Sequence, residues 1–324
     1  MVYVGVDHST TGVKVGILDG DEEQTAFTLD RARLGDGSVT LLDALSERVT
    51  TDAIDRAAIT YSWGNGIASI QDIERTDNRG IKDHIGAGYE LGGGTAAYDE
   101  LEASSVPAVV IPGVHRELPP LHPYFSHYSA LAGGDKVAAI RYAQHRLADE
   151  TDGEEFIWAC ASSSCMAGLV SDGALRGFFH WMGLMHGWPD PEALREMDED
   201  RVEDVLMRCG VLHRSGLEFD EIRETPDEQA MEMCYWATVH NIYSLVPFAH
   251  ETGGGPPEAI ALTGRLTRVD EPDLSGRVAE TCSDVAPTYR CGEYSSAYGA
   301  AHVARDVDRG EPDVLGIPVA EGLA

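Results

Sequence analysis

An acid and a base stand close together near the start of the chain. Asp7 closes an apolar run, and Lys14 follows it by seven positions. Between them lies a turn rich in hydroxyl groups, formed by Ser9, Thr10, Thr11 and Gly12. Hydroxyls and open backbone amides in a tight turn can hold a phosphate. A neighbouring carboxylate can orient water around a Mg2+ ion that bridges phosphates, while a lysine neutralises their charge. Another interpretation is that Asp7 only satisfies turn amides, as Asp often does in tight turns.

The same pattern returns 153 positions later, so that Ser162 stands where Ser9 stands in the first copy. The two copies cover residues 2–20 and 156–173. Each copy reads as a strand, a hydroxyl turn, a returning strand and an Asp-Gly hairpin turn, with a third strand near residues 24–29 or 174–179. The second hydroxyl turn contains Ser162, Ser163 and Ser164, which either bind phosphate or form a plain polar connection. The repeat predicts two similar half-molecules.

Strand and helix patterns alternate along the rest of the chain, which favours an α/β fold. We expect strands near residues 57–62, 106–111 and 259–263, and helices near residues 39–49, 95–103, 136–147, 189–209, 226–249 and 295–305. A glycine pair before Asp135 marks a helix start, and we place the domain boundary there. The predicted domains are residues 1–133 and 134–324.

The composition limits the classes of partner. The 324 residues contain 55 acidic and 24 basic side chains, a formal charge of −31, and only three lysines: Lys14, Lys82 and Lys136. This predicts an acidic coat on a folded protein that works at high salt, and it argues against nucleic acid, which needs clustered Lys and Arg. No apolar run is long enough to cross a membrane. The six cysteines include no C-x-x-C pair, so we expect reduced thiols in a cytoplasm.

A second group of residues with chemical potential lies in the proline-rich segment 112–129. Arg116 follows His115, and His122 and His127 come shortly after. Imidazole and guanidinium groups could supply the positive charge that a phosphoryl group needs during transfer. The other interpretation is a loop held together by hydrogen bonds.

Together these motifs resemble the acetate and sugar kinase, heat-shock-70 and actin superfamily. The resemblance rests on residues 4–11, on the second hairpin at 160–173, on the strand and turn 259–264, and on Gly299-Ala300-Ala301. It implies duplicated actin-like (ribonuclease H-like) ATPase domains with mixed sheets, which close on ATP and Mg2+ in an interdomain cleft. It also implies that Asp7 orients Mg2+ through water, that both hydroxyl turns and Lys14 bind phosphates, and that Gly264 lies beside the adenosine.

More narrowly, the chain resembles methanogenesis marker protein 12, an archaeal family found in methane-producing organisms. The shared segments are residues 4–12, 61–64, 92–95, 111–116 and 262–265. The segment 125–141 is also similar to part of butyrate kinase, which implies a small carboxylate acceptor near Arg116 and His127. The family context suggests a methanogenesis protein as a partner, and a homodimer stays open.

Three departures from the superfamily pattern bear on activity. Ser9 stands where the superfamily usually has glycine, Cys160 stands where the second hairpin usually starts with an acid, and Arg265 follows Gly264 in place of a second glycine. A neutral thiol cannot orient a metal as a carboxylate does. Three hypotheses therefore remain open: an ATP-dependent phosphotransferase or ATPase, a nucleotide-responsive scaffold without turnover, and a fold that has lost nucleotide binding.

Overall fold

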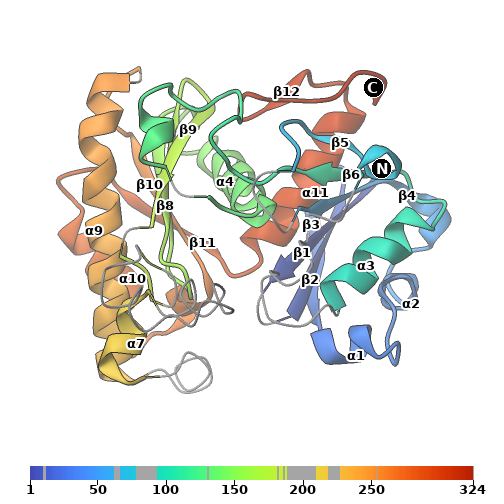
Figure 1. The fold of residues 1–324 in the computed structure, drawn as a ribbon, viewed down its shortest axis with the longest axis horizontal. Helices are drawn as coiled ribbons and strands as arrows, with labels where there is room; N and C mark the ends of the chain where they lie inside the picture. The colour runs from blue at the N-terminus through green and yellow to red at the C-terminus, as the bar shows by residue number, and fades with distance from the viewer. Residues whose placement is uncertain are drawn as a thin grey trace, which may run out of the picture. The chain divides into compact units, whose positions relative to one another are not determined.

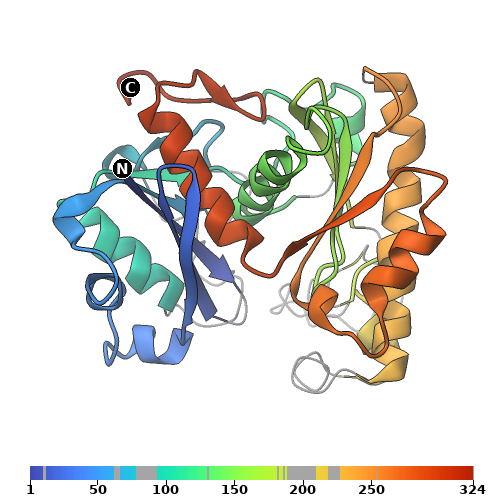
Figure 2. The same cartoon turned by 180° about the vertical axis from the view of Figure 1, so that it is seen from behind.

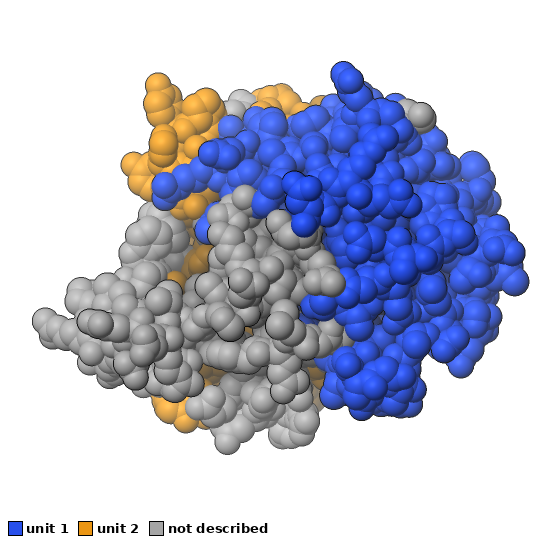
Figure 3. Space-filling view, turned by 45° about the vertical axis from the view of Figure 1, so that its right-hand side comes forward, with its two compact units in different colours: residues 1–121, 131–145, 294–324 blue, residues 122–130, 146–293 orange. Residues whose placement is uncertain are grey.

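The computed structural model describes residues 1–9, 12–61, 66–77, 93–129, 131–180, 182–184, 187, 209–217, 227–252 and 254–323. Figure 3 colours its two compact units. Unit 1 comprises residues 1–121, 131–145 and 294–324, and unit 2 comprises residues 122–130 and 146–293. This division differs from the predicted single boundary between residues 133 and 134. The reason is that two helices from later in the chain pack with the first sheet. They are the beginning of the helix at residues 134–147 and the whole of the helix at residues 295–308.

The sheet of unit 1 is mixed and has six strands in the order β3-β2-β1-β4-β6-β5. Its strands are β1 (Val2–Ser9), β2 (Gly12–Asp19), β3 (Glu22–Leu29), β4 (Ile54–Thr60), β5 (Gln71–Asp72) and β6 (Ala108–Ile111). The first three strands form an antiparallel meander, whereas β4 and β6 run parallel to β1. The carboxyl ends of β1, β4 and β6 therefore meet at one edge of the sheet.

The other elements of unit 1 are helices, short 3-10 turns and a separate two-stranded sheet. They are α1 (Arg31–Gly35), α2 (Leu41–Ser46), η1 (Thr51–Ala53), η2 (Ile73–Arg75), α3 (Gly93–Glu102), α4 (Gly134–Leu147), α11 (Ser295–Asp308), β12 (Asp313–Val314) and β13 (Ile317–Pro318). The last two residues of α4 belong to unit 2.

Residue alternation decides which helices cover which face of β1. Val4 and Val6 belong to a buried cluster that includes side chains of α1, α2 and α3. Tyr3 and Gly5 point to the opposite face, because successive side chains of a strand alternate. That face packs against α11, which runs across the sheet in Figure 2.

Gly5 allows α11 to approach β1 more closely than any other residue could. A Cβ atom on Gly5 would lie 2.0 Å from the carbonyl oxygen of Ala297 and 2.3 Å from the amide nitrogen of Ala301. At the far end of the helix, the Tyr3 hydroxyl donates a hydrogen bond of 2.9 Å to Asp308. The contact fixes α11 along β1, which brings the start of the helix to the carboxyl end of the strand.

Unit 2 contains a five-stranded mixed sheet in the order β11-β10-β7-β8-β9. The strands are β7 (Phe156–Cys160), β8 (Ala167–Ser171), β9 (Ala174–Phe179), β10 (Ala259–Thr263) and β11 (Thr288–Gly292). The remaining elements are η3 (Phe125–His127), α7 (Val211–Ser215), α9 (Glu228–Thr252), η4 (Arg265–Arg268) and α10 (Leu274–Thr281).

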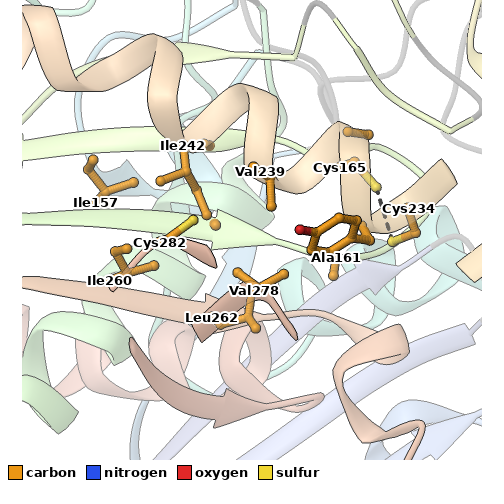
Figure 4. Packing of buried hydrophobic residues seen from close by; sticks show 14 of the residues in the cluster. Ile157, Ala161, Cys165, Cys234, Val239, Ile242, Ile260, Leu262, Val278 and Cys282 are labelled. Atoms are coloured by element: carbon orange, nitrogen blue, oxygen red, sulfur yellow. Dashed lines mark hydrogen bonds between the residues drawn. The ribbon is translucent and has the colours of Figure 1, made fainter. Parts of the chain in front are cut away.

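The long helix α9 and the shorter α10 cover one face of this sheet, as Figure 1 shows for α9 beside β8 and β10. Their apolar side chains form one buried cluster with the strands (Figure 4). Ile157 and Ile260 enter this cluster from the sheet, and Ile242 and Val278 enter it from the helices. The thiols of Cys165 and Cys234 lie in the same cluster with their sulfur atoms 3.5 Å apart.

The two sheets share one topology, which confirms the duplicated α/β fold. Each has an antiparallel three-stranded meander followed by two parallel strands. Each also has a register irregularity just before its second hairpin turn, between Ile17 and Leu18 and between Leu169 and Val170. Asp7 pairs with Lys14 across the first hydroxyl turn. The Cys160 amide bonds to the Met166 carbonyl across the second hydroxyl turn, so Cys160 occupies in the second meander the position that Asp7 occupies in the first. The second hydroxyl turn is one residue shorter.

Two further predictions concern a helix at residues 189–209 and membrane-spanning segments. The helix predicted over residues 189–209 lies outside the described residues except for Cys209. Within the described ranges, no helix combines the length and apolar character needed to span a bilayer.

Candidate functional site

The acid and the base singled out in the sequence lie opposite each other in unit 1. Asp7 near the end of β1 pairs directly with Lys14 on β2. Directly opposed residues on antiparallel strands place their side chains on the same face. This is the face that α11 covers, and the ammonium of Lys14 lies 5.9 Å from the ring centre of Tyr294, the residue before that helix.

The first turn of α11 contacts Asp7 directly. The Ser296 hydroxyl donates a hydrogen bond of 2.5 Å to Oδ2 of Asp7. The other carboxylate oxygen, Oδ1, is buried and has no hydrogen-bond partner among the described residues. One oxygen of Asp7 is thus held by the protein, and the other has no partner among the described residues.

The first turn of α4 completes the surroundings of Asp7. The Gly134 amide donates to the Tyr61 carbonyl over 2.8 Å, which holds the helix start at the carboxyl end of β4. Asp135 and Lys136 follow and form an ion pair with each other. Both charges act on Asp7, and both side chains are partly exposed. We call Asp7, Lys14, Asp135 and Lys136 the acid–lysine cluster.

Within the acid–lysine cluster, Asp7 is buried and its pKa is far from that of an exposed aspartate. Asp7 is only 2% exposed, and its pKa is raised to about 6, first because burial disfavours the charged form and then because Asp135 carries a like charge. Lys14, the Ser296 hydrogen bond and Lys136 act in the opposite direction. A buried acid with a raised pKa beside cationic groups is typical of a functional site.

His8 follows Asp7 in sequence but faces the other side of the sheet. Its amide donates to the Thr60 hydroxyl over 3.2 Å, and its ring lies against Gly94 at the start of α3. Burial lowers the pKa of His8 to about 3, so the imidazole is neutral at physiological pH. His8 therefore does not share the face on which Asp7 and Lys14 lie.

The first hydroxyl turn is described only at its two ends. Ser9 ends β1 and pairs with Gly12 at the start of β2, which closes the predicted hairpin. Thr10 and Thr11 lie outside the described residues, as does the side chain of Ser9. Phosphate binding by Ser9, Thr10, Thr11 and Gly12 stays a prediction.

The second hydroxyl turn, in unit 2, is held partly by thiols. The Cys160 sulfur lies 3.1 Å from the Ser162 hydroxyl, and the Cys165 thiol donates to the Ser162 carbonyl over 3.1 Å. Ser163 is partly exposed. The Ser164 hydroxyl is buried and has no partner in the described part of the chain. Ser164 is therefore the member of this turn with an open hydrogen-bonding capacity.

Gly264 has a structural reason to be glycine. It follows β10 with φ of +101°, and a Cβ atom there would lie 2.5 Å from the carbonyl oxygen of Ala161. The Ala161 amide also bonds to the Thr263 carbonyl over 2.8 Å. The turn thus joins the ends of β7 and β10, and a role beside adenosine stays a prediction.

Arg116 and His127 both have exposed side chains, and they belong to different units. No hydrogen bond or ion pair is described for the guanidinium of Arg116. The neighbouring histidines hold the loop together, since His115 bonds to the Ile67 carbonyl over 2.9 Å and His122 accepts from two backbone amides. No contact among the described residues links Arg116 to the acid–lysine cluster, and His127 belongs to the other unit, so their catalytic role stays a prediction.

Sequence reasoning missed two members of this site and undervalued a third. Ser296 and Asp135 were not singled out as site residues, because each is reached only through the packing of a distant helix on β1. Lys136 carried a usable signal, since only three lysines occur in the chain and two of them lie in this cluster.

Three solved structures with similar folds are named as kinases. A propionate kinase from Francisella tularensis has a TM-score of 0.59 at 11% identity, over 94% of this chain and 98% of that chain. An acetate kinase from Porphyromonas gingivalis has a TM-score of 0.52 at 12% identity, over 90% and 89%. A glucokinase of the ROK family from Streptomyces griseus, solved with glucose and AMPPNP, has a TM-score of 0.50 at 14% identity, over 94% and 100%. At these identities the likeness shows the fold, which is that of actin-like ATPases and sugar kinases.

No protein-family model matches the sequence. Curated relatives nevertheless cover almost all of it. A UPF0285 protein from Methanothermobacter thermautotrophicus is 33% identical over 98% of this chain and 98% of its own length. A second, from Methanocaldococcus jannaschii, is 31% identical over 98% and 99%. With this identity over nearly the full length, the chain belongs to the UPF0285 family.

Proposed function

We propose that this protein is an ATP-dependent phosphotransferase or ATPase that binds Mg2+ and nucleotide phosphates at the acid–lysine cluster. One observation carries the proposal. The buried carboxylate of Asp7 has one oxygen with no hydrogen-bond partner in the described part of the chain, and two of the three lysines of a lysine-poor chain act on its charge. The fold shared with known kinases supports the same reading, although fold alone does not assign a reaction.

The donor set of the cluster fits Mg2+ held through water and phosphate. The described residues contain no group of three or more His, Cys, Asp or Glu side chains that could hold a metal. Mg2+ does not require such a group, because it usually keeps several waters and binds one or two carboxylates together with substrate phosphates. Asp7 supplies a hard oxygen ligand for such an arrangement, and the bound ion would neutralise charge that develops on the phosphates.

The protein groups then have separate roles in phosphoryl transfer. Asp7, ionised above its pKa of about 6, would hold a metal-bound water. Lys14 and Lys136, whose charges both act on Asp7, would neutralise phosphate oxygens. Such fixed charges lower the barrier because they are already in place when charge develops in the transition state.

We extend the proposal to the remaining predicted residues. The hydroxyls of Ser162, Ser163 and Ser164 would bind phosphate oxygens, and the open hydroxyl of Ser164 supports this role. Gly264 would lie beside the adenosine, since ligands of open α/β sheets bind at the carboxyl ends of strands. Arg116 and His127 would bind a small carboxylate acceptor.

The organisms of the relatives support a proposal for the biological role. They come from organisms such as Methanothermobacter and Methanocaldococcus, whose names mark them as methane producers. We therefore propose a role in methane metabolism, in agreement with the resemblance to methanogenesis marker protein 12.

A second candidate function is a scaffold that binds nucleotide without turning it over. Cys160 favours it, because this thiol occupies in unit 2 the place that Asp7 occupies in unit 1. A scaffold would respond to nucleotide by changing its affinity for a partner in methane metabolism.

One experiment separates the two candidates. Purified protein is incubated with ATP and Mg2+ at high salt, and ADP and phosphate are measured with and without candidate carboxylate acceptors. Turnover that is lost in Lys14→Ala supports the phosphotransferase or ATPase. Tight binding without ADP formation supports the scaffold, and the absence of any binding contradicts both.

A further inference from the structure

We infer that Ser296 is a positioning residue that orients Asp7 toward Mg2+-bound nucleotide. The inference rests on the proposed function of the acid–lysine cluster and adds to it a residue outside that cluster. Ser296 lies in the first turn of α11, 289 positions after Asp7 in the chain.

The hydrogen bond leaves the two oxygens of Asp7 in different states. Ser296 donates to Oδ2, so this oxygen has a fixed partner, whereas Oδ1 has none among the described residues. A carboxylate that could rotate would present its two oxygens interchangeably. Because one oxygen is tied to α11, the other has a defined direction, which is what a group that orients metal-bound water requires.

The position of Ser296 is itself fixed by tight packing. The next residue, Ala297, and the later Ala301 lie against Gly5, which is two residues before Asp7 on the same face of β1. Both hydrogen-bonding partners are also buried, Asp7 at 2% and Ser296 at 8% exposure. Neither side chain can reorient freely, so the bond is a permanent part of the fold.

The second meander has no acid at the position that matches Asp7. The matching place at the end of β7 is taken by Cys160, whose neutral thiol cannot hold metal-bound water. Of these two matching strand-end positions, only that of Asp7 carries a carboxylate, so its orientation matters.

The test measures how much Mg2+ is needed for ATP binding. In calorimetric titrations at fixed high salt, Ser296→Ala should raise the Mg2+ concentration for half-maximal ATP binding about tenfold, the effect of losing one hydrogen bond to a charged group. Ser296→Thr keeps the hydroxyl and should restore binding. Ser295→Ala removes a neighbouring buried hydroxyl that has no described bond to Asp7 and should leave the requirement unchanged.

A double-mutant cycle separates positioning from a general structural effect. In an Asp7→Ala background, Ser296→Ala should change the Mg2+ requirement no further, because the group it orients is gone. An equal effect of Ser296→Ala with and without Asp7 overturns the inference, as does unchanged Mg2+ dependence in a folded Ser296→Ala protein. If the wild-type protein binds no ATP at all, the proposed function is wrong. That result differs from one in which the wild-type protein binds ATP and only the effect of Ser296→Ala is missing.

Discussion

Asp7 is held in the fold at a cost to stability. Its pKa is raised from 3.8 to about 6, first by burial and then by the charge of Asp135. The folded protein therefore binds the proton more tightly than the unfolded chain does. The stabilisation from a protonated Asp7 is complete below pH 3.8 and is lost as the pH rises through about 6. Above that range, the ionised carboxylate is retained although it destabilises the fold.

Replacement of Asp7 by asparagine should stabilise the protein at neutral pH. We expect Asp7→Asn to raise the free energy of unfolding by on the order of 1–3 kcal/mol at pH 8, and to change it little below pH 4, because the penalty belongs to the ionised form. Chemical denaturation at both pH values measures the difference. Asp149→Asn, at an exposed position, is the matched control. Equal or lower stability of Asp7→Asn at pH 8 would show that the ionised carboxylate is not penalised.

The sequence identifies Asp7 and Lys14 because they stand in one hairpin, where strand register alone brings them together. Ser296 and Asp135 could not be found in this way. Each belongs to a helix that is distant in the chain, and only the packing of α4 and α11 against the strand ends brings it near Asp7. Local patterns thus predict two of the five residues of the candidate site, Asp7 and Lys14, and tertiary contacts supply the rest.

At the scale of elements, the contact between β1 and α11 determines the site. Gly5 is the point of closest approach, and the residues on either side of it bond to the two ends of the helix. Tyr3 bonds to Asp308, and Asp7 bonds to Ser296. Displacement of α11 would therefore separate Ser296 from Asp7 even if both residues were present.

A methyl group at position 5 should disrupt this contact. We expect Gly5→Ala to lower the free energy of unfolding by about 1–3 kcal/mol, because the new Cβ atom would collide with the backbone of α11, which cannot move aside as a side chain can. Thermal and chemical denaturation provide the measurement. Gly94→Ala is a suitable control, since the three nearest described atoms to its Cβ atom would all belong to the His8 side chain, the nearest at 3.3 Å. A Gly5→Ala protein as stable as the control would mean that α11 does not pack on β1 this closely.

The sequence predicted strands correctly where an apolar run stands between turn residues. It did not predict elements that are short or that mix polar and apolar residues. The strands at residues 174–179 and 259–263 have the predicted bounds, since both are apolar runs between turn residues. The short helix α1, the helix α10 and the strand β11 were not predicted. β11 contains the polar residues Thr288 and Arg290 and is a strand because it pairs with the buried β10.

At the scale of the whole molecule, the chain is a duplication whose halves have diverged chemically. The two sheets share strand order and hairpin register, yet the first meander has Asp7 where the second has Cys160. The repeat in the sequence predicted the two similar halves, and the resemblance to the kinase and actin superfamily implied this fold class. It could not predict that residues 134–145 and 294–324 belong with the first sheet, because that assignment depends on packing and not on chain order.

The charge of −31 should make the stability of the molecule strongly dependent on salt. Like charges on the folded surface repel one another, and dissolved ions screen this repulsion. We expect the melting temperature to rise continuously as KCl is increased from about 0.1 M, where the Debye length is about 10 Å, to about 1 M, where it is about 3 Å. Sorbitol at matched osmolality is the control. A melting temperature that responds equally to sorbitol, or not at all to KCl, would argue against charge repulsion as the cause.

The most direct test of the account is the calorimetric titration of the protein with ATP in the presence and absence of Mg2+ at high salt. We predict Mg2+-dependent binding by the wild-type protein, at least about tenfold weaker in Asp7→Ala and unchanged in Asp149→Ala. ATP binding that is equally tight without Mg2+, or equally tight in Asp7→Ala, would contradict the assignment of the acid–lysine cluster as the nucleotide site.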